Sequence, residues 1–345
     1  MDVILLIIGY ILAAFIAFNI GGNDAANPVD TAVGSGVLSL KEALLLFSIG
    51  VFIGSVLQGH SVIKTIGRGI IPSMTAIAAI SAVIAGGAWI LLATIKGMPV
   101  STTQSITGGV IGVGLGMVLR NEIPFSQLSL GVLTNIFLSW LSSPLTAIFV
   151  SYALYRLTWR RLSRLEEAEN GRKYIRIFMI ASLLFSAYSF GANDVANATG
   201  VYLSVTSQYF GLPDSASMLI LSVIGSLGII TGGWTIGRRV IETVAFKITK
   251  LDYKSGLTAE VSNALTVWLF TTLPSMLIGY GMPISTTHAS VSSIIGVGIA
   301  KHKSVSSIDK STIISIFTSW ILTLPTTIIM GILTYLILSF VAGYI

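Results

Sequence analysis

The sequence contains no cysteine, and charged residues make up only 10% of its 345 residues. The lack of cysteine excludes disulfide bonds, thiolate metal sites and thiol nucleophiles. The lack of charge excludes an ordinary soluble domain, in which about a quarter of the residues are charged. Because 53% of the residues are hydrophobic, we expect an integral membrane protein.

Catalytic signatures are missing as well, since the sequence offers no recognisable nucleophile–base pair and no metal-ligand cluster. We therefore expect no enzymatic activity. The 20 basic residues exceed the 14 acidic ones, but they lie in short loops between apolar runs. That distribution is typical of membrane proteins, so we expect no binding to nucleic acid.

Long apolar runs fill the chain, and a helix needs about 20 such residues to cross a bilayer. Runs of this length predict helices rather than strands. The runs lie at 3–20, 43–58, 74–95, 98–119 and 127–157 in the first half, and at 174–190, 214–236, 257–280, 283–300 and 311–342 in the second. We predict an all-α membrane protein with about 10 to 12 transmembrane helices.

The two halves carry the same motifs in the same order. Gly-Gly-Asn-Asp-Ala-Ala-Asn at 21–27 recurs as Gly-Ala-Asn-Asp-Val-Ala-Asn at 191–197. Gly-Met-Pro-Val-Ser-Thr-Thr at 97–103 recurs as Gly-Met-Pro-Ile-Ser-Thr-Thr at 281–287. Ordered matches of this kind indicate an internal duplication.

The direction of the second repeat follows from the loops. If every run crosses once, an odd number of crossings turns the second copy upside down. With the central connector inside, 17 of the 20 Lys and Arg residues, Lys96 among them, fall in inside loops, as the positive-inside rule requires. We predict two inverted repeats, 1–157 and 174–345, joined by a cytoplasmic connector at 158–173. The protein would be a multi-pass protein of the cell (inner or plasma) membrane, with both termini outside.

The first motif places carboxylates and carboxamides inside apolar runs. A bilayer tolerates such groups only where they are paired or line a wet cavity. Inverted repeats with interrupted helices and re-entrant segments are typical of secondary transporters, whose sites lie near the midplane where the repeats meet. We therefore predict a transport site around both copies of the motif. Asp30 has no acidic counterpart in the second repeat, where Gly200 takes its place, and we leave it outside this site.

The second motif has the features of a helix start. Proline suits the first turn of a helix, Ser and Thr suit its N-cap, and the free N–H groups there can hold an oxyanion. In the alternative interpretation the hydroxyls bond only to their own helix. His288 replaces Gln104 of the first repeat, and we interpret it as a hydrogen-bonding contact rather than a proton relay. The predicted substrate-binding residues are Asn27, Ser101, Thr102, Thr103, Gln104, Asn197, Ser285, Thr286, Thr287 and His288.

Neither motif contains Arg or Lys. An anionic substrate would therefore meet two carboxylates with no fixed cation beside them, which is unfavourable at low dielectric. A cation must enter with the substrate, and Na⁺ suits carboxylate, carboxamide and hydroxyl oxygens. Proton uptake by the aspartates is the alternative. We predict Asn23, Asp24, Asn193 and Asp194 as Na⁺ ligands, with no organic cofactor. Arg68 and Arg238, which also recur, are interpreted as residues that snorkel to the interface.

At these motifs the chain resembles the inorganic phosphate transporter (PiT) family. The resemblance is carried by Gly-Ala-Asn-Asp-Val-Ala-Asn-Ala at 191–198, its copy at 22–27, and the two Pro-x-Ser-Thr-Thr segments. It implies inverted repeats, outward-facing termini, a homodimer, and uptake of inorganic phosphate coupled to a cation. Three alternatives remain. The protein could be a proton-coupled phosphate or metal-phosphate transporter, or an anion channel. It could also be a sulfate permease, because sulfate permeases share the Gly-Ile-Ile-Pro stretch seen here at 69–72.

Overall fold

The computed structural model describes residues 2–63, 70–71, 74–202, 215–279, 281–304 and 308–343. Within these ranges the regular secondary structure is entirely helical. Eight of the described helical segments are long and apolar enough to cross a membrane, which confirms the predicted all-α membrane class. The expected number was 10 to 12, and the predicted runs at 257–280 and 283–300 are the two that are not among these eight described segments.

The helices of the first half are α1 (Asp2–Asp24), α2 (Ala26–Gly34), α3 (Leu40–Gln58), α5 (Ala76–Ile95), α6 (Thr102–Leu119) and α7 (Leu130–Glu167), with a 3₁₀ turn at Phe125–Gln127. Those of the second half are α8 (Gly171–Thr199), α10 (Ser215–Thr235), α11 (Arg238–Lys247), α12 (Tyr253–Ile278), α13 (Thr286–His302) and α14 (Lys310–Gly343), with a 3₁₀ turn at Gly200–Tyr202.

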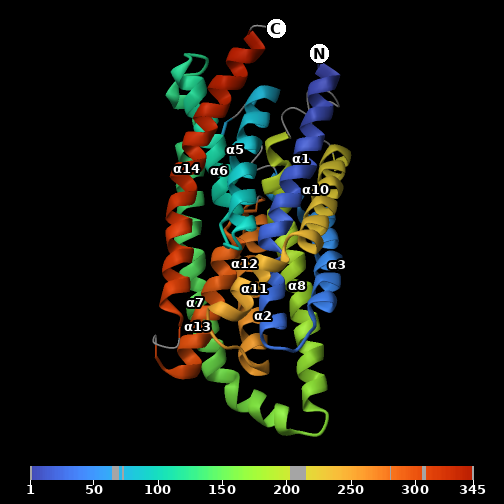
Figure 1. Ribbon diagram of the computed structural model, residues 1–345. Helices are drawn as coiled ribbons and strands as arrows, with labels where there is room; N and C mark the ends of the chain where they lie inside the picture. Colours follow the sequence, from blue (N-terminus) through green and yellow to red (C-terminus); the bar gives the residue numbers. More distant parts are fainter. Residues whose placement is uncertain are drawn as a thin grey trace.

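The helices form one elongated bundle (Figure 1). Both chain termini lie at one end of it, which we call the termini end. The turn between α7 and α8 lies at the other end, which we call the connector end. Because α7 continues to Glu167 and α8 begins at Gly171, most of the charged connector prolongs these two helices.

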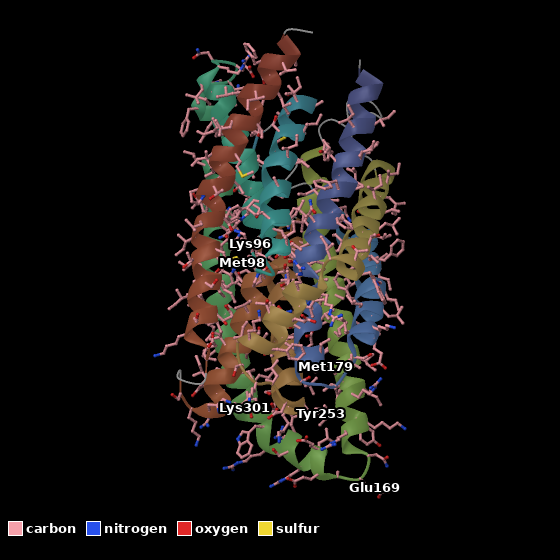
Figure 2. The ribbon with its side chains drawn as sticks, in the orientation of Figure 1. Lys96, Met98, Glu169, Met179, Tyr253 and Lys301 are labelled. Atoms are coloured by element: carbon pink, nitrogen blue, oxygen red, sulfur yellow. The ribbon has the colours of Figure 1, made fainter. Side chains whose placement is uncertain are left out.

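Two pairs of helices do not cross the bundle. Helices α5 and α6 form a hairpin in the half nearer the termini end, and α12 and α13 form one in the half nearer the connector end (Figure 1). Lys96 and Met98, at the tip of the first hairpin, lie about halfway along the molecule, whereas Tyr253 and Lys301 lie near the connector end (Figure 2). The two hairpins therefore enter from opposite ends and meet in the middle.

In this arrangement the second repeat is still inverted relative to the first, but the helices that cross the bundle differ from the predicted ones. The crossings of the first half are α1–α2, α3 and α7, and those of the second half are α8, α10–α11 and α14. Among the described helices, an odd number of crossings in each half still turns the second repeat over. Lys96, which the charge count placed in an inside loop, lies instead at a hairpin tip.

Glycines allow the helices that carry the first motif to pack closely. A Cβ atom on Gly21 in α1 would lie 1.8 Å from the carbonyl oxygen of Ile229 in α10. In the second repeat, a Cβ on Gly191 in α8 would lie 2.4 Å from the carbonyl oxygen of Val51 in α3. Small residues at such contacts let two backbones approach within the membrane. Both copies of the Asn-Asp motif are thereby held against a neighbouring helix.

Candidate functional site

The first motif interrupts a helix in only one of the two repeats. Helix α1 ends at Asp24 and α2 begins at Ala26, whereas α8 continues through its own copy of the motif to Thr199. Pro28 explains the difference, because it has no N–H for the carbonyl of Asp24 and its ring clashes with that carbonyl. The corresponding residue of the second repeat is Ala198, which permits a continuous helix.

The second motif starts a helix in both repeats, as predicted. The Ser101 hydroxyl accepts a hydrogen bond of 3.2 Å from the Gln104 N–H at the start of α6. The Ser285 hydroxyl accepts one of 3.2 Å from the His288 N–H at the start of α13. The N-terminal turns of α6 and α13 thus both lie at the hairpin tips, in the middle of the bundle.

The two hairpin tips are joined by a reciprocal pair of hydrogen bonds. Thr103 of the first tip donates to the carbonyl oxygen of Ile284 in the second, at 2.7 Å. Thr287 of the second tip donates to the carbonyl oxygen of Val100 in the first, at 3.1 Å. This exchange follows the symmetry of the repeats and brings the two Ser-Thr-Thr segments together.

Asp24 and Asp194 meet at this junction, and both side chains are fully buried. The Thr102 hydroxyl donates to Asp24 Oδ2 at 2.5 Å and lies 3.4 Å from Asp194 Oδ1. Thr287 donates to Asp24 Oδ1 at 3.2 Å. Asp194 Oδ2 has no hydrogen-bond partner in the described part of the chain. One threonine therefore lies between two buried carboxylates, with no basic side chain from either motif.

Asn27 and Asn197 connect the carboxylates to the hairpin tips. The Asn27 amide donates to the hydroxyls of Thr286 and Thr287, at 3.1 and 3.2 Å. The Asn197 amide donates to Thr103 at 2.9 Å and to Asp194 at 2.8 Å. Both asparagine side-chain oxygens are buried without a partner among the described residues. Carboxylate, amide and hydroxyl oxygens are the ligands that hard cations prefer.

Asn23 and Asn193 hold the hairpins of their own repeats. The Asn23 amide donates to the carbonyl of Met98 at 3.0 Å, and its oxygen accepts from the Val100 N–H at 3.0 Å. The Asn193 amide donates to the carbonyl of Met282 at 3.0 Å. The polar atoms of Asn23 are thus engaged with the first tip, whereas the Asn193 oxygen is buried without a partner in the described chain.

His288 and Gln104 occupy equivalent places with different surroundings. The His288 ring is buried and stacks on Trp320, with 3.9 Å between the ring centres. Trp320 in turn donates to the carbonyl of Pro99 in the first tip, at 3.2 Å. The Gln104 oxygen is buried with no partner within the described residues. The structure therefore places every predicted site residue within or beside the junction of the hairpin tips.

Sequence reasoning missed a second acidic cluster beside this junction. Asp30 accepts a hydrogen bond from Ser290, Glu260 accepts one from Thr31, and both carboxylates are fully buried. Asn263, three residues after Glu260 in α12, donates to the carbonyl of Asn27 in the first motif at 2.9 Å. Glu260 could have been found, because it is an isolated carboxylate within an apolar run.

Of the two recurring arginines, the structure describes one. Arg238 lies on the surface and pairs with Glu242 at 2.7 Å, while Arg68 lies outside the described residues.

The fold and the site together define a class of protein. Two inverted hairpins meet at a buried polar junction, and helix N-termini and carboxylates converge there. This is the architecture of a secondary transporter.

Comparison with known families identifies the transporter more closely. The model of the phosphate transporter family matches residues 20–331, so the chain belongs to this family. Membership confirms the resemblance drawn from the motifs, and it confirms a phosphate permease rather than an enzyme.

Individual relatives agree with this assignment. A chain of Pyrococcus abyssi, provisionally named a phosphate permease, is 31% identical, and the match covers 93% of this chain and 94% of the relative. A similarly named chain of Thermococcus kodakarensis is 30% identical over 97% and 98% of the two chains. A solved structure described as the sodium-dependent phosphate transporter matches with a TM-score of 0.83 and 29% identity, covering 97% of this chain and 99% of that one.

Proposed function

We propose that this phosphate permease imports inorganic phosphate together with Na⁺ by alternating access. One observation supports this proposal most strongly. Two fully buried carboxylates, Asp24 and Asp194, flank a single threonine hydroxyl where the hairpin tips meet, and the motifs bring no basic residue to them.

The carboxylates require positive charge when phosphate binds beside them. Two unit charges about 6 Å apart repel by roughly 3 kcal/mol at an effective dielectric constant of about 20. A phosphate anion adds further repulsion, which cations that bind with it would offset. We propose that Asp24 and Asp194, with oxygens from Asn23 and Asn193, bind Na⁺. The name of the solved relative, a sodium-dependent phosphate transporter, supports this choice.

The hydroxyls and helix N-termini at the tips suit the phosphate itself. The N-termini of α6 and α13 present positive dipole ends toward the junction. Ser101 and Ser285 already cap these helices, which leaves the threonines of both tips, Gln104 and His288 to contact oxyanion oxygens. The amides of Asn27 and Asn197 already donate to the threonines and would position them.

The transport cycle would use the contact between the hairpins. The bonds from Thr103 to Ile284 and from Thr287 to Val100 join one tip to the other. We propose that they form and break as one hairpin moves against the other, exposing the junction alternately to each end of the bundle. We place the connector end in the cytoplasm, because most basic loop residues lie there. We also propose a homodimer, which the family resemblance implies.

Uptake into proteoliposomes tests the proposal. An inward Na⁺ gradient should drive concentrative uptake of radiolabelled phosphate, whereas an equal choline gradient at the same pH should not. Uptake that is equal in both and collapses with a pH gradient would instead assign the coupling to protons. Competition by sulfate stronger than by phosphate would identify a sulfate permease, and non-saturable downhill flux would identify a channel.

A further inference from the structure

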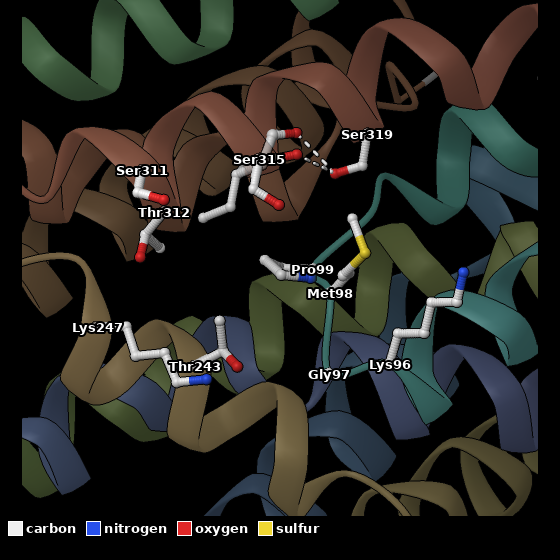
Figure 3. A pocket seen from close by; sticks show the side chains of 11 residues that line it. Lys96, Gly97, Met98, Pro99, Thr243, Lys247, Ser311, Thr312, Ser315 and Ser319 are labelled. Atoms are coloured by element: carbon white, nitrogen blue, oxygen red, sulfur yellow. Dashed lines mark hydrogen bonds between the residues drawn. The ribbon is translucent and has the colours of Figure 1, made fainter.

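A cavity of about 260 Å³ lies against the tip of the first hairpin, outside the carboxylate junction. Its wall is formed by residues 96–99 at the tip, by Thr243 and Lys247 of α11, and by the first turns of α14 (Figure 3). Five hydroxyl-bearing side chains line it, namely Thr243, Ser311, Thr312, Ser315 and Ser319. The cavity is therefore polar, although apolar helices surround it.

The charge of this cavity is wholly positive. Lys96 and Lys247 line it, on opposite sides of Met98 and Pro99 (Figure 3), and no acidic residue does. Neither lysine forms an ion pair within the described chain. This differs from the connector-end lysines Lys254 and Lys301, each of which pairs with a carboxylate.

Both lysine side chains are exposed, so the lack of an ion partner is informative only because of the depth at which Lys96 lies. It lies about halfway along the bundle (Figure 2), at a depth where a charged side chain is costly unless it faces a cavity or an opposite charge. The flexible four-carbon stems of both lysines allow their ammonium groups to reach a common ligand. Two unpaired ammonium groups and several hydroxyls form a donor set suited to an oxyanion.

We infer that this cavity is a second binding site for a phosphate group, in which free inorganic phosphate rests after it leaves the carboxylate junction toward the connector end. Met98 and Pro99 line the cavity and are separated from the Ser-Thr-Thr segment at 101–103 by Val100 alone. Movement of this tip would therefore open the junction to the cavity. The inference rests on the proposed function for the source of the phosphate, but binding in the cavity is measurable without transport.

Labelling of a single cysteine tests the site directly, because the chain contains none of its own. Ser315→Cys introduces a thiol into the cavity wall. Its reaction with a small neutral maleimide is followed in phosphatidylcholine nanodiscs during titration with inorganic phosphate, with gluconate at equal ionic strength as the reference. We expect saturable protection by phosphate and none by gluconate.

Two further variants locate the bound phosphate. Lys247→Gln should raise the half-protecting phosphate concentration by about tenfold or more, as expected for the loss of one charge-assisted hydrogen bond, and addition of Lys96→Gln should raise it further. Lys173→Gln, a change of an exposed lysine of α8 that does not line the cavity, should leave it unchanged. Protection should also persist with Thr286→Val, which alters only the central junction.

The alternative outcomes are distinct. Lack of protection in a protein that transports phosphate would overturn the site. If Thr286→Val abolishes the protection and the lysine changes leave it intact, the protecting phosphate binds at the central junction instead. Protection without phosphate in discs that contain phosphatidylglycerol would identify a lipid headgroup and overturn the release role. Phosphate protection in a protein that transports no phosphate would refute the proposed function and leave the site standing.

Discussion

Replacing Asp194 by Asn removes one charge from the junction and almost nothing else. Asp194 Oδ1 accepts the hydrogen bond from Asn197, which an asparagine oxygen can also accept, and Oδ2 has no partner among the described residues. The substitution should therefore leave the hairpins in place. We expect it to raise the Na⁺ concentration that half-saturates phosphate uptake by about 10- to 100-fold.

The magnitude follows from the contact that is lost. An interaction with a charged group contributes about 1.5–3 kcal/mol net, and 1.4 kcal/mol corresponds to about tenfold in an equilibrium constant. The bridging distances of 2.5 and 3.4 Å through Thr102 place the two carboxylate oxygens at most about 6 Å apart, where each influences a cation bound to the other. Because the variant also repels phosphate less, its phosphate constant at saturating Na⁺ should not rise.

The assay is initial-rate phosphate uptake into proteoliposomes over a range of Na⁺ concentrations. Asp309→Asn is the matched control for the Na⁺ dependence, because Asp309 caps the start of α14 through the Thr312 N–H, outside the carboxylate junction, and asparagine also caps helices well. The control should retain the Na⁺ dependence of the wild type. Unchanged Na⁺ dependence in Asp194→Asn would refute the assignment of this carboxylate to the cation.

Three further predictions concern substrate binding and folding. Thr286→Val should raise the phosphate concentration for half-maximal uptake several-fold at saturating Na⁺, and an unchanged value would make this hydroxyl structural. Gly21→Ala should lower the thermal unfolding midpoint sharply, because the new Cβ would lie 1.8 Å from the Ile229 carbonyl oxygen. Gly131→Ala is the control and should leave the midpoint unchanged, because nothing lies within 4 Å of its new Cβ. Equal midpoints in the two variants would contradict the close packing at Gly21. Asp252→Ala should lower the unfolding free energy, measured by denaturant titration, by about 1 kcal/mol through loss of the α12 N-cap. A change below about 0.5 kcal/mol, the low end for caps, would contradict this. The hydrogen bond from the Ser255 N–H, together with the neighbouring Lys301, holds the pKa of Asp252 below its usual value. The wild-type stabilisation should therefore be present above about pH 4 and be lost as the pH falls through that lowered pKa.

Composition and repetition were sufficient to predict the class of the protein and the residues of its junction. Ser101 and Ser285 placed the starts of α6 and α13 correctly, because capping is a local interaction. The prolines, which were expected in the first turn, lie two residues before these caps instead. The same local reasoning could not show that Asn23 would hold the Met98 and Val100 backbone. That contact depends on how a hairpin folds back inside the bundle.

The hairpins themselves were not predictable from run length. Helices α5 and α6 are apolar enough to cross a membrane, yet they enter and return from the same end, because their tip packs on the opposite hairpin. Glu260 was missed for a related reason. It is an isolated carboxylate within an apolar run, but it has no repeated motif around it, and its place beside α2, where Asp30 is also buried, depends on the packing of α12.

Binding of labelled Na⁺ to the purified protein, with and without phosphate, tests the central claim most directly. If cations compensate Asp24 and Asp194 when phosphate binds, each ligand should raise the affinity for the other by the same factor, since coupling between two sites is reciprocal. The account predicts tighter Na⁺ binding in the presence of phosphate, and loss of this coupling in Asp194→Asn. Phosphate binding that is equally tight with and without Na⁺ would contradict it.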